Sequence, residues 1–210
     1  MEFDGAVFEA RAINAWRGDR HILRDVSFTV RPGEFLKVTG PNGVGKTTLL
    51  RVICGLLPAE TGDLFWRGQS IRGRRDEFNF ELGHLGHLNS LKGDLTAREN
   101  LKFLAGLRTS LTPDLIDATL DRVGILSRGD LPARSLSAGQ KRRLALARLL
   151  LADAALWILD EPVTNLDTAG IELVEHLIVE HVGRGGMAIA AAHQRLLDDA
   201  PCLRRLELTP

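Results

Sequence analysis

Residues 40–47 have the spacing of a loop that binds the phosphates of a nucleotide. They read Gly-Pro-Asn-Gly-Val-Gly-Lys-Thr and fit the pattern GxxxxGK[ST]. Gly43 and Gly45 let backbone N–H groups converge on phosphate oxygens. Lys46 can reach the β- and γ-phosphates, and Thr47 can place a hydroxyl on Mg²⁺. The alternative is a glycine-rich turn without a ligand. The predicted phosphate-binding set is Gly40, Pro41, Asn42, Gly43, Val44, Gly45, Lys46, Thr47 and Thr48.

Two adjacent carboxylates, Asp160 and Glu161, follow the apolar run 156–159. Such a run is typical of a parallel strand buried on both faces. Ligands of open α/β sheets gather at the carboxyl ends of the strands, so both carboxylates are expected near the phosphate loop. Asp160 suits Mg²⁺, and Glu161 suits activation of an attacking water. A helix cap beside Pro162 is the alternative role.

The elements that must position these groups follow from hydrophobic periodicity and turn residues. Residues 34–39 predict a strand that runs into the phosphate loop, and apolar residues before Gly55 predict a helix after it. A capping box at Thr96 and Glu99 predicts the start of another helix. Further strands are predicted at 26–30, 63–66, 156–159 and 187–192, and further helices at 112–124, 137–151 and 168–182.

This order of elements predicts an α/β fold in one domain, residues 1–210. The expected core covers about 1–85 and 155–210, and a helical subdomain is inserted at about 86–154.

Composition excludes several classes of protein. The chain has 27 basic and 27 acidic residues and a formal net charge of zero, which argues against nucleic acid as the main partner. Cys54 and Cys202 are too few for a disulfide framework. No apolar run reaches the length of a membrane span, and the acidic N-terminus does not resemble a signal peptide. A membrane role is therefore expected to require a partner.

The order of the motifs resembles the nucleotide-binding domain of ATP-binding cassette (ABC) ATPases. The motifs are the phosphate loop, LSAGQ at 136–140, LWILDEP at 156–162, the turn at 165–167 and His193 after the last apolar strand. This resemblance covers nearly the whole chain. It implies a P-loop NTPase core with a parallel-rich sheet, an N-terminal antiparallel β portion and an inserted helical subdomain.

The same resemblance implies a head-to-tail dimer that holds two ATP molecules with Mg²⁺. The phosphate loop of one copy would face Ser137, Gly139 and Gln140 of the other copy, which open a helix and offer N–H donors to a γ-phosphate. His193 would reach the γ-phosphate, and Asp167 would lie at the dimer seam. Glu161, His193 and His87 form the predicted catalytic set, and Thr47 and Asp160 form the predicted metal-binding pair.

Two aromatic positions have alternative roles. Trp16 precedes the strand at 26–30, where ABC domains often carry an aromatic residue that stacks on adenine; core packing is the alternative. His87 stands where the family usually has a glutamine that contacts Mg²⁺ and water, and an imidazole lacks the donor and acceptor ends of an amide. Three further histidines, His21, His176 and His181, are expected to be solvated surface residues.

A closer resemblance is to the CcmA family, the ATPase subunits of cytochrome c maturation. The segments that carry it are Leu-Gly-His at 85–87, LTARENL at 95–101, LSAGQKRRLALARL and LWILDEP. It implies haem export or release of a haem chaperone, driven with integral membrane subunits at the cytoplasmic face of a bacterial inner membrane. The alternatives are the ATPase subunit of another small transporter, for lipoproteins, metals or peptides, and a soluble ABC ATPase.

Overall fold

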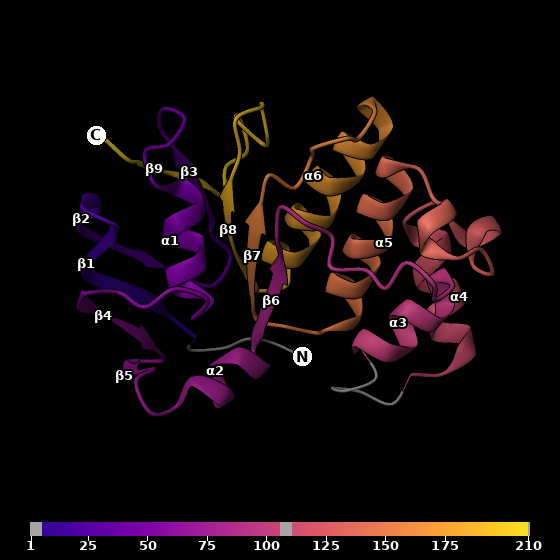
Figure 1. The fold of residues 1–210 in the computed structure, drawn as a ribbon, viewed down its shortest axis with the longest axis horizontal. Helices are drawn as coiled ribbons and strands as arrows, with labels where there is room; N and C mark the ends of the chain where they lie inside the picture. The colour runs from indigo at the N-terminus through magenta and orange to yellow at the C-terminus, as the bar shows by residue number, and fades with distance from the viewer. Residues whose placement is uncertain (1–5, 106–110, 210) are drawn as a thin grey trace.

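The computed structural model describes residues 6–105 and 111–209 and contains two sheets (Figure 1). The first is antiparallel, with strand order β2-β1-β4-β5, and the second is parallel, with order β6-β7-β8-β3-β9. The antiparallel sheet comprises β1 (Phe8–Arg17), β2 (Arg20–Val30), β4 (Thr61–Trp66) and β5 (Gln69–Ser70). The parallel sheet comprises β3 (Phe35–Thr39), β6 (Leu82–Leu85), β7 (Leu156–Asp160), β8 (Met187–Ala191) and β9 (Leu203–Glu207).

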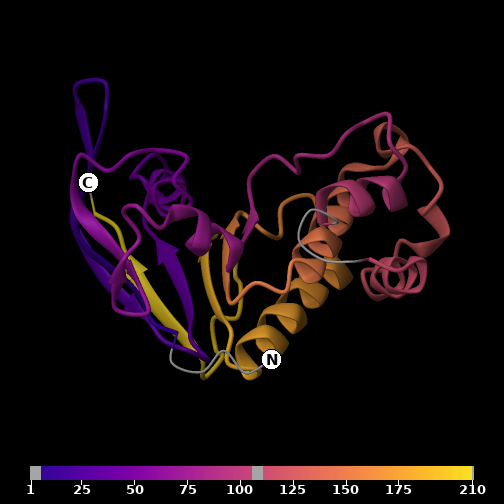
Figure 2. The same ribbon diagram turned by 90° about the horizontal axis from the view of Figure 1, so that it is seen from below.

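The helices cover both faces of the parallel sheet. They are α1 (Lys46–Ile53), α2 (Arg75–Phe80), α3 (Ala97–Ala105), α4 (Pro113–Arg122), α5 (Ala138–Leu151) and α6 (Thr168–Gly183), with short 3₁₀ turns at Leu126–Arg128 and Ala133–Ser135. Helix α1 lies between the two sheets (Figure 2), where Leu49, Leu50 and Ile53 join a core shared with both. A second core packs α5, α6 and the α3–α4 region against the opposite face.

Sequence patterns explain why these elements form where they do. All five residues of β7 are buried because β6 and β8 flank it and helices cover its faces. Helix α3 begins at the predicted capping box, in which the Thr96 N–H donates to Glu99 Oε2 at 2.8 Å. Helix α4 begins after Thr112, whose hydroxyl accepts from the Leu115 N–H. The predicted α/β fold, including its antiparallel β portion, is confirmed.

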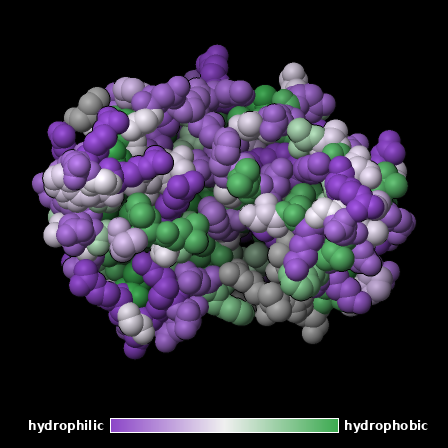
Figure 3. Space-filling model, in the orientation of Figure 1, coloured by the Kyte–Doolittle hydropathy of each residue, from purple (hydrophilic) through white to green (hydrophobic). Residues whose placement is uncertain are grey.

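The division into a core and a helical subdomain stays a proposal. Helices α3, α4 and α5 contact one another on the side of the parallel sheet away from the antiparallel sheet (Figure 1). Hydrophilic residues cover much of the face seen in Figure 3, with apolar residues in smaller patches. None of the described helices is both long and apolar enough to cross a bilayer.

The prediction that His181 is a surface residue is wrong. Its side chain is buried in α6, and its ring stacks on Trp157 with centroids 3.9 Å apart. A ring nitrogen lies 3.1 Å from the carbonyl oxygen of Met187. Gly186 makes room for the ring, because a Cβ at that position would lie 2.4 Å from it. Burial lowers the pKa of His181 from 6.5 to about 4.

This low pKa predicts that mild acid destabilises the fold through His181. In the unfolded chain the imidazole takes up a proton near pH 6.5, whereas in the folded chain it is protonated only near pH 4. Stability is therefore lost as the pH falls from 6.5 to 4. Between pH 7 and pH 5, the free energy of unfolding measured in urea should fall by about 2 kcal/mol more in the parent than in His181→Gln. His176→Gln, at an exposed position of the same helix, should behave like the parent. Equal pH dependence in the parent and His181→Gln would contradict this account.

Candidate functional site

The predicted phosphate loop and the predicted carboxylates meet at one edge of the parallel sheet. The loop follows β3, and Asp160 ends β7, so both groups lie at carboxyl ends of parallel strands. The Thr47 hydroxyl donates to Asp160 Oδ1 at 3.1 Å. The two residues predicted to bind a metal are therefore in direct contact.

The backbone of the phosphate loop requires glycine at its two tightest positions. Gly40 has φ 133°, and a Cβ there would lie 2.4 Å from the carbonyl oxygen of Leu208. Gly45 has φ 119° and precedes α1, and a Cβ there would lie 2.8 Å from Ile22 Cγ2. No side chain caps the start of α1, and its first turn holds no acidic residue. Its N–H groups are thus suited to bind an anion.

The Lys46 ammonium group is buried within its own loop. It donates to the carbonyl oxygens of Gly40 at 2.7 Å and Pro41 at 3.0 Å. Burial lowers its pKa, and the negative charges of Glu161 and Asp160 oppose that shift. The ammonium group therefore lies inside the loop, close enough to Glu161 and Asp160 to feel both negative charges.

Glu161 and His193, two of the predicted catalytic residues, are brought together. The backbone N–H of His193 donates to Glu161 Oε2 at 3.3 Å, and His193 Nε2 lies 3.5 Å from Glu161 Oε1. Glu161 follows β7 with φ 49°, a left-handed conformation that costs energy for a residue other than glycine. Asp160, the preceding residue, is 5% exposed. The carboxylates therefore point into a site built from β7 and the segment after β8.

The third predicted catalytic residue, His87, is exposed on the loop after β6. Within residues 6–105 and 111–209, its side chain makes no hydrogen bond or ion pair. Whether His87 contacts a nucleotide therefore stays a prediction.

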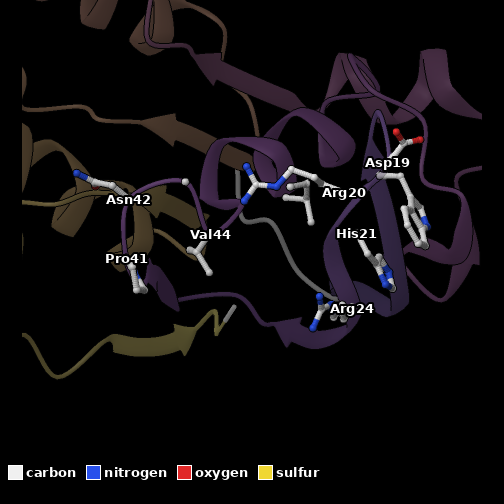
Figure 4. Close-up of a pocket in the computed structure, with 10 residues that line it drawn as sticks. Asp19, Arg20, His21, Arg24, Pro41, Asn42 and Val44 are labelled. Carbon is white, nitrogen blue, oxygen red and sulfur yellow. The ribbon is translucent and has the colours of Figure 1, made fainter.

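A pocket of about 680 Å³ lies between the phosphate loop and the antiparallel sheet. Figure 4 shows Pro41, Asn42 and Val44 on one side of it and His21 on the other. Trp16 also lines the pocket, is 48% exposed, and stacks on His21 with ring centroids 4.4 Å apart. His21 is thus half-buried and lines the pocket, which corrects its expected place on the solvated surface.

The LSAGQ segment makes local hydrogen bonds at the start of α5. Ser137 and Gln140 form a reciprocal capping box, in which the Gln140 N–H donates to Ser137 Oγ at 3.2 Å. Gly139 packs closely on the turn before α6, since a Cβ there would lie 3.0 Å from the Asn165 carbonyl oxygen. Asp167 caps α6 by accepting from the Gly170 N–H at 2.9 Å. These contacts account for the local structure and leave the dimer role of the segment as a prediction.

Two buried cations, Lys37 and Arg142, support this site, although the sequence predicted no role for them. Lys37, inside β3, donates to the carbonyl oxygen of Gln194 at 3.2 Å and to Asp198 at 2.5 Å, which fixes the segment after His193. Arg142, in α5, donates to the backbone of residues 160–162. The signal for Lys37 was a lysine inside an otherwise apolar strand, Phe35-Leu36-Lys37-Val38.

Comparison with known proteins identifies the family. Residues 23–164 match the ABC transporter family. The chain belongs to this family. It is 45% identical over 192 residues to the cytochrome c biogenesis ATP-binding export protein CcmA 2 of Cupriavidus metallidurans, with 91% of each chain covered. It is 42% identical to CcmA of Aliivibrio fischeri, with 96% of this chain and 99% of that protein covered. The predicted resemblance to CcmA is confirmed.

Solved structures of the ABC family share the fold. An ATP-binding ABC transporter protein from Pyrococcus furiosus superposes with a TM-score of 0.82 at 25% identity, covering 96% of this chain and 97% of that one. The family match and the CcmA relatives show that the chain is an ATP-hydrolysing enzyme of the ABC type.

The residues of this ABC ATPase fit Mg²⁺. The Thr47 hydroxyl and the Asp160 carboxylate present two hard oxygen donors 3.1 Å apart, and Mg²⁺ prefers such ligands together with phosphate oxygens. Thr47 and Asp160 are the residues that would hold the ion.

The exposed indole beside the loop predicts that Trp16 contributes to ATP affinity. Stacking on a base is worth about 1–3 kcal/mol, so Trp16→Ala should weaken ATP binding roughly ten-fold and Trp16→Phe far less. Titration calorimetry of each variant measures this. Inorganic tripolyphosphate, which has no base, should bind the parent and both variants alike. Unchanged ATP affinity in Trp16→Ala would assign the indole to packing against His21 alone.

Proposed function

We propose that this ABC ATPase powers c-type cytochrome biogenesis, either through haem export or through release of a haem chaperone. The CcmA proteins that support this proposal align with nearly the whole chain at 41–48% identity. The direct contact between Glu161 and His193, beside the Thr47–Asp160 pair, is the observation that carries the hydrolytic part.

In the proposed mechanism the phosphate loop holds the triphosphate. Lys46 exchanges its bonds to the Gly40 and Pro41 carbonyls for bonds to the β- and γ-phosphates, and the N-terminus of α1 adds N–H donors. The remaining loop residues, Asn42 to Thr48, surround the phosphates, and Trp16 stacks on adenine. Thr47 and Asp160 would hold Mg²⁺, which would neutralise charge on the phosphates.

Hydrolysis is assigned to the residues that follow β7 and β8. Glu161 orients the attacking water and accepts its proton, while His193 donates a hydrogen bond to the γ-phosphate. The contact between them places the Glu161 carboxylate and the His193 ring side by side at the carboxyl ends of β7 and β8. His87 is proposed to sense the site through water.

A second copy of the chain completes each site in this proposal. Ser137, Gly139 and Gln140 of the second copy present the N-terminus of α5 to the γ-phosphate, and Asp167 lies at the seam between the copies. In a single chain the first turn of α5 contains no acidic residue, so its N–H groups suit an anion. Two ATP molecules would then be held between two chains.

The membrane partner is proposed to dock beside residues 87–104, between the core and the helical subdomain. Two exposed apolar side chains lie close to the start of this segment: Leu88, next to His87 in the sequence, is 78% exposed, and Leu56, which lines a pocket with His84 and Ser90, is 65% exposed. This pocket of about 390 Å³, also lined by Leu82, lies between the segment after α1, strand β6 and the end of α5. The proposed partners are integral membrane subunits of the cytochrome c maturation system, which would hold the ATPase at the cytoplasmic face of a bacterial inner membrane.

A genetic complementation tests this function. A strain that lacks the gene should fail to attach haem covalently to periplasmic cytochromes. The parent gene should restore attachment, and Glu161→Gln should not, although the protein accumulates. Haem-stained gels of periplasmic fractions measure the result. Normal attachment in the uncomplemented strain would assign the ATPase to a different transporter.

A further inference from the structure

Arg142 lies in the first turns of α5, two residues after the LSAGQ segment, and is 2% exposed. A guanidinium group has five N–H donors in a planar fork. In this structure the group makes five hydrogen bonds of 2.7 to 3.0 Å, so its full donor capacity is matched by acceptors. A buried guanidinium group with all its hydrogen bonds satisfied restrains the segments of the chain that carry its acceptors.

Three of these acceptors are consecutive backbone carbonyls at the end of β7. Arg142 Nη2 donates to the carbonyl oxygens of Asp160 at 2.8 Å and Glu161 at 2.7 Å. Its Nε donates to the carbonyl oxygen of Pro162 at 3.0 Å. The guanidinium group therefore holds the backbone that carries both functional carboxylates, without touching their side chains.

The other two acceptors lie on the loop after β6. Arg142 Nη1 donates to the carbonyl oxygen of Gly86 at 2.8 Å and to Asn89 Oδ1 at 3.0 Å. These residues bracket His87 in the sequence. One planar group thus joins α5, the end of β7 and the loop 86–89.

Glu161 needs such support because its backbone is strained. Its φ of 49° is unfavourable for a side chain with a Cβ, and such strain persists only where neighbours fix it. Its N–H donates to the Ala191 carbonyl oxygen at 2.8 Å, and its carbonyl oxygen accepts from Arg142. The peptide groups on both sides of the Glu161 Cα are thereby held, which sets the direction of its carboxylate.

The charge of Arg142 is kept despite burial. Burial lowers its pKa to about 10, and the negative charges of Asp160 and Glu161 oppose that shift. The group therefore stays protonated at neutral pH.

We propose that Arg142 is a positioning residue for ATP hydrolysis. Its hydrogen bonds couple the position of the loop 86–89 to the direction of the Glu161 carboxylate. The inference rests on the proposed function of Glu161. Lysine keeps the charge but offers three donors from a single nitrogen atom, so it cannot span both segments.

The test compares steady-state ATP hydrolysis by the purified full chain and by Arg142→Lys. We expect kcat to fall roughly ten- to a hundred-fold with KM for ATP within two-fold of the parent, because misplacing a reacting group affects turnover more than binding. Arg98→Lys is the matched control. Arg98 makes two ion pairs of 2.7 Å, with Asp117 and Asp130, away from this site. The Arg98→Lys variant should lose thermal stability and keep the kcat of the parent.

A parent-like kcat in Arg142→Lys would overturn the proposal, and so would an equal loss of kcat in Arg98→Lys. If Arg142→Lys does not fold, Asn89→Ala decides, since it removes one acceptor and leaves the guanidinium in place. We expect a two- to five-fold lower kcat and an unchanged KM, and a parent-like kcat there would also overturn the proposal. An inactive parent, or an unaffected Glu161→Gln, would instead refute the proposed function.

Discussion

ATP turnover should fall by about 10²- to 10⁴-fold when Glu161 is replaced by glutamine, whereas ATP affinity should stay close to that of the parent. The substitution removes the base that accepts a proton from water. It keeps the shape of the side chain, whose Oε2 lies 3.3 Å from the backbone nitrogen of His193 and whose Oε1 lies 3.5 Å from His193 Nε2. Phosphate release measures turnover, and titration calorimetry measures affinity.

The control for this loss is Glu180→Gln. Glu180 lies on α6 and forms ion pairs with Arg122 and Arg184 at the surface, remote from the phosphate loop in the fold. It should hydrolyse ATP at the parent rate. If Glu161→Gln also did so, Glu161 could not be the residue that activates water.

Replacing Lys46 by alanine should weaken ATP binding by about one to two orders of magnitude. The buried ammonium group donates to two carbonyls of its own loop and is placed to donate to phosphate oxygens. Each hydrogen bond to a charged group is worth about 1.5–3 kcal/mol, which sets the size of the loss. Calorimetric titration with ATP measures it.

Lys102→Ala provides the comparison, since Lys102 is an exposed residue of α3. It removes the same charge from the chain and should bind ATP as the parent does. Equal affinity in Lys46→Ala and the parent would show that the phosphate loop is not the nucleotide site.

The fold could be predicted where local sequence signals were strong. The strand, loop and helix around Lys46, the capping box at Thr96 and the helix start at Ser137 were confirmed, because cap residues and apolar runs act locally. Strand β9, Leu-Arg-Arg-Leu-Glu, was missed because it is an edge strand with few buried residues and pairs only with β3. Helix α2, six residues without a side-chain cap, gave no signal either.

The residues of the site that belong to sequence motifs were predicted, and the residues outside those motifs were not. The contact of Thr47 with Asp160 follows from the parallel sheet, which brings the carboxyl ends of β3 and β7 to one edge. The roles of Lys37, Arg142 and His181 could not be read from the sequence, because their partners lie on other elements. The sequence does not distinguish a buried polar residue from an exposed one. The difference depends on hydrogen-bond partners that other elements supply in the folded chain.

In the proposed dimer, two chains enclose ATP between the phosphate loop of one copy and the LSAGQ segment of the other. The measurement that tests it most directly is the molar mass of Glu161→Gln in solution, by light scattering, with saturating ATP and Mg²⁺. The account predicts twice the 23.1 kDa of a single chain, with two bound ATP molecules, and a single-chain mass when Lys46→Ala is added. A mass of 23.1 kDa for Glu161→Gln with bound ATP would contradict it.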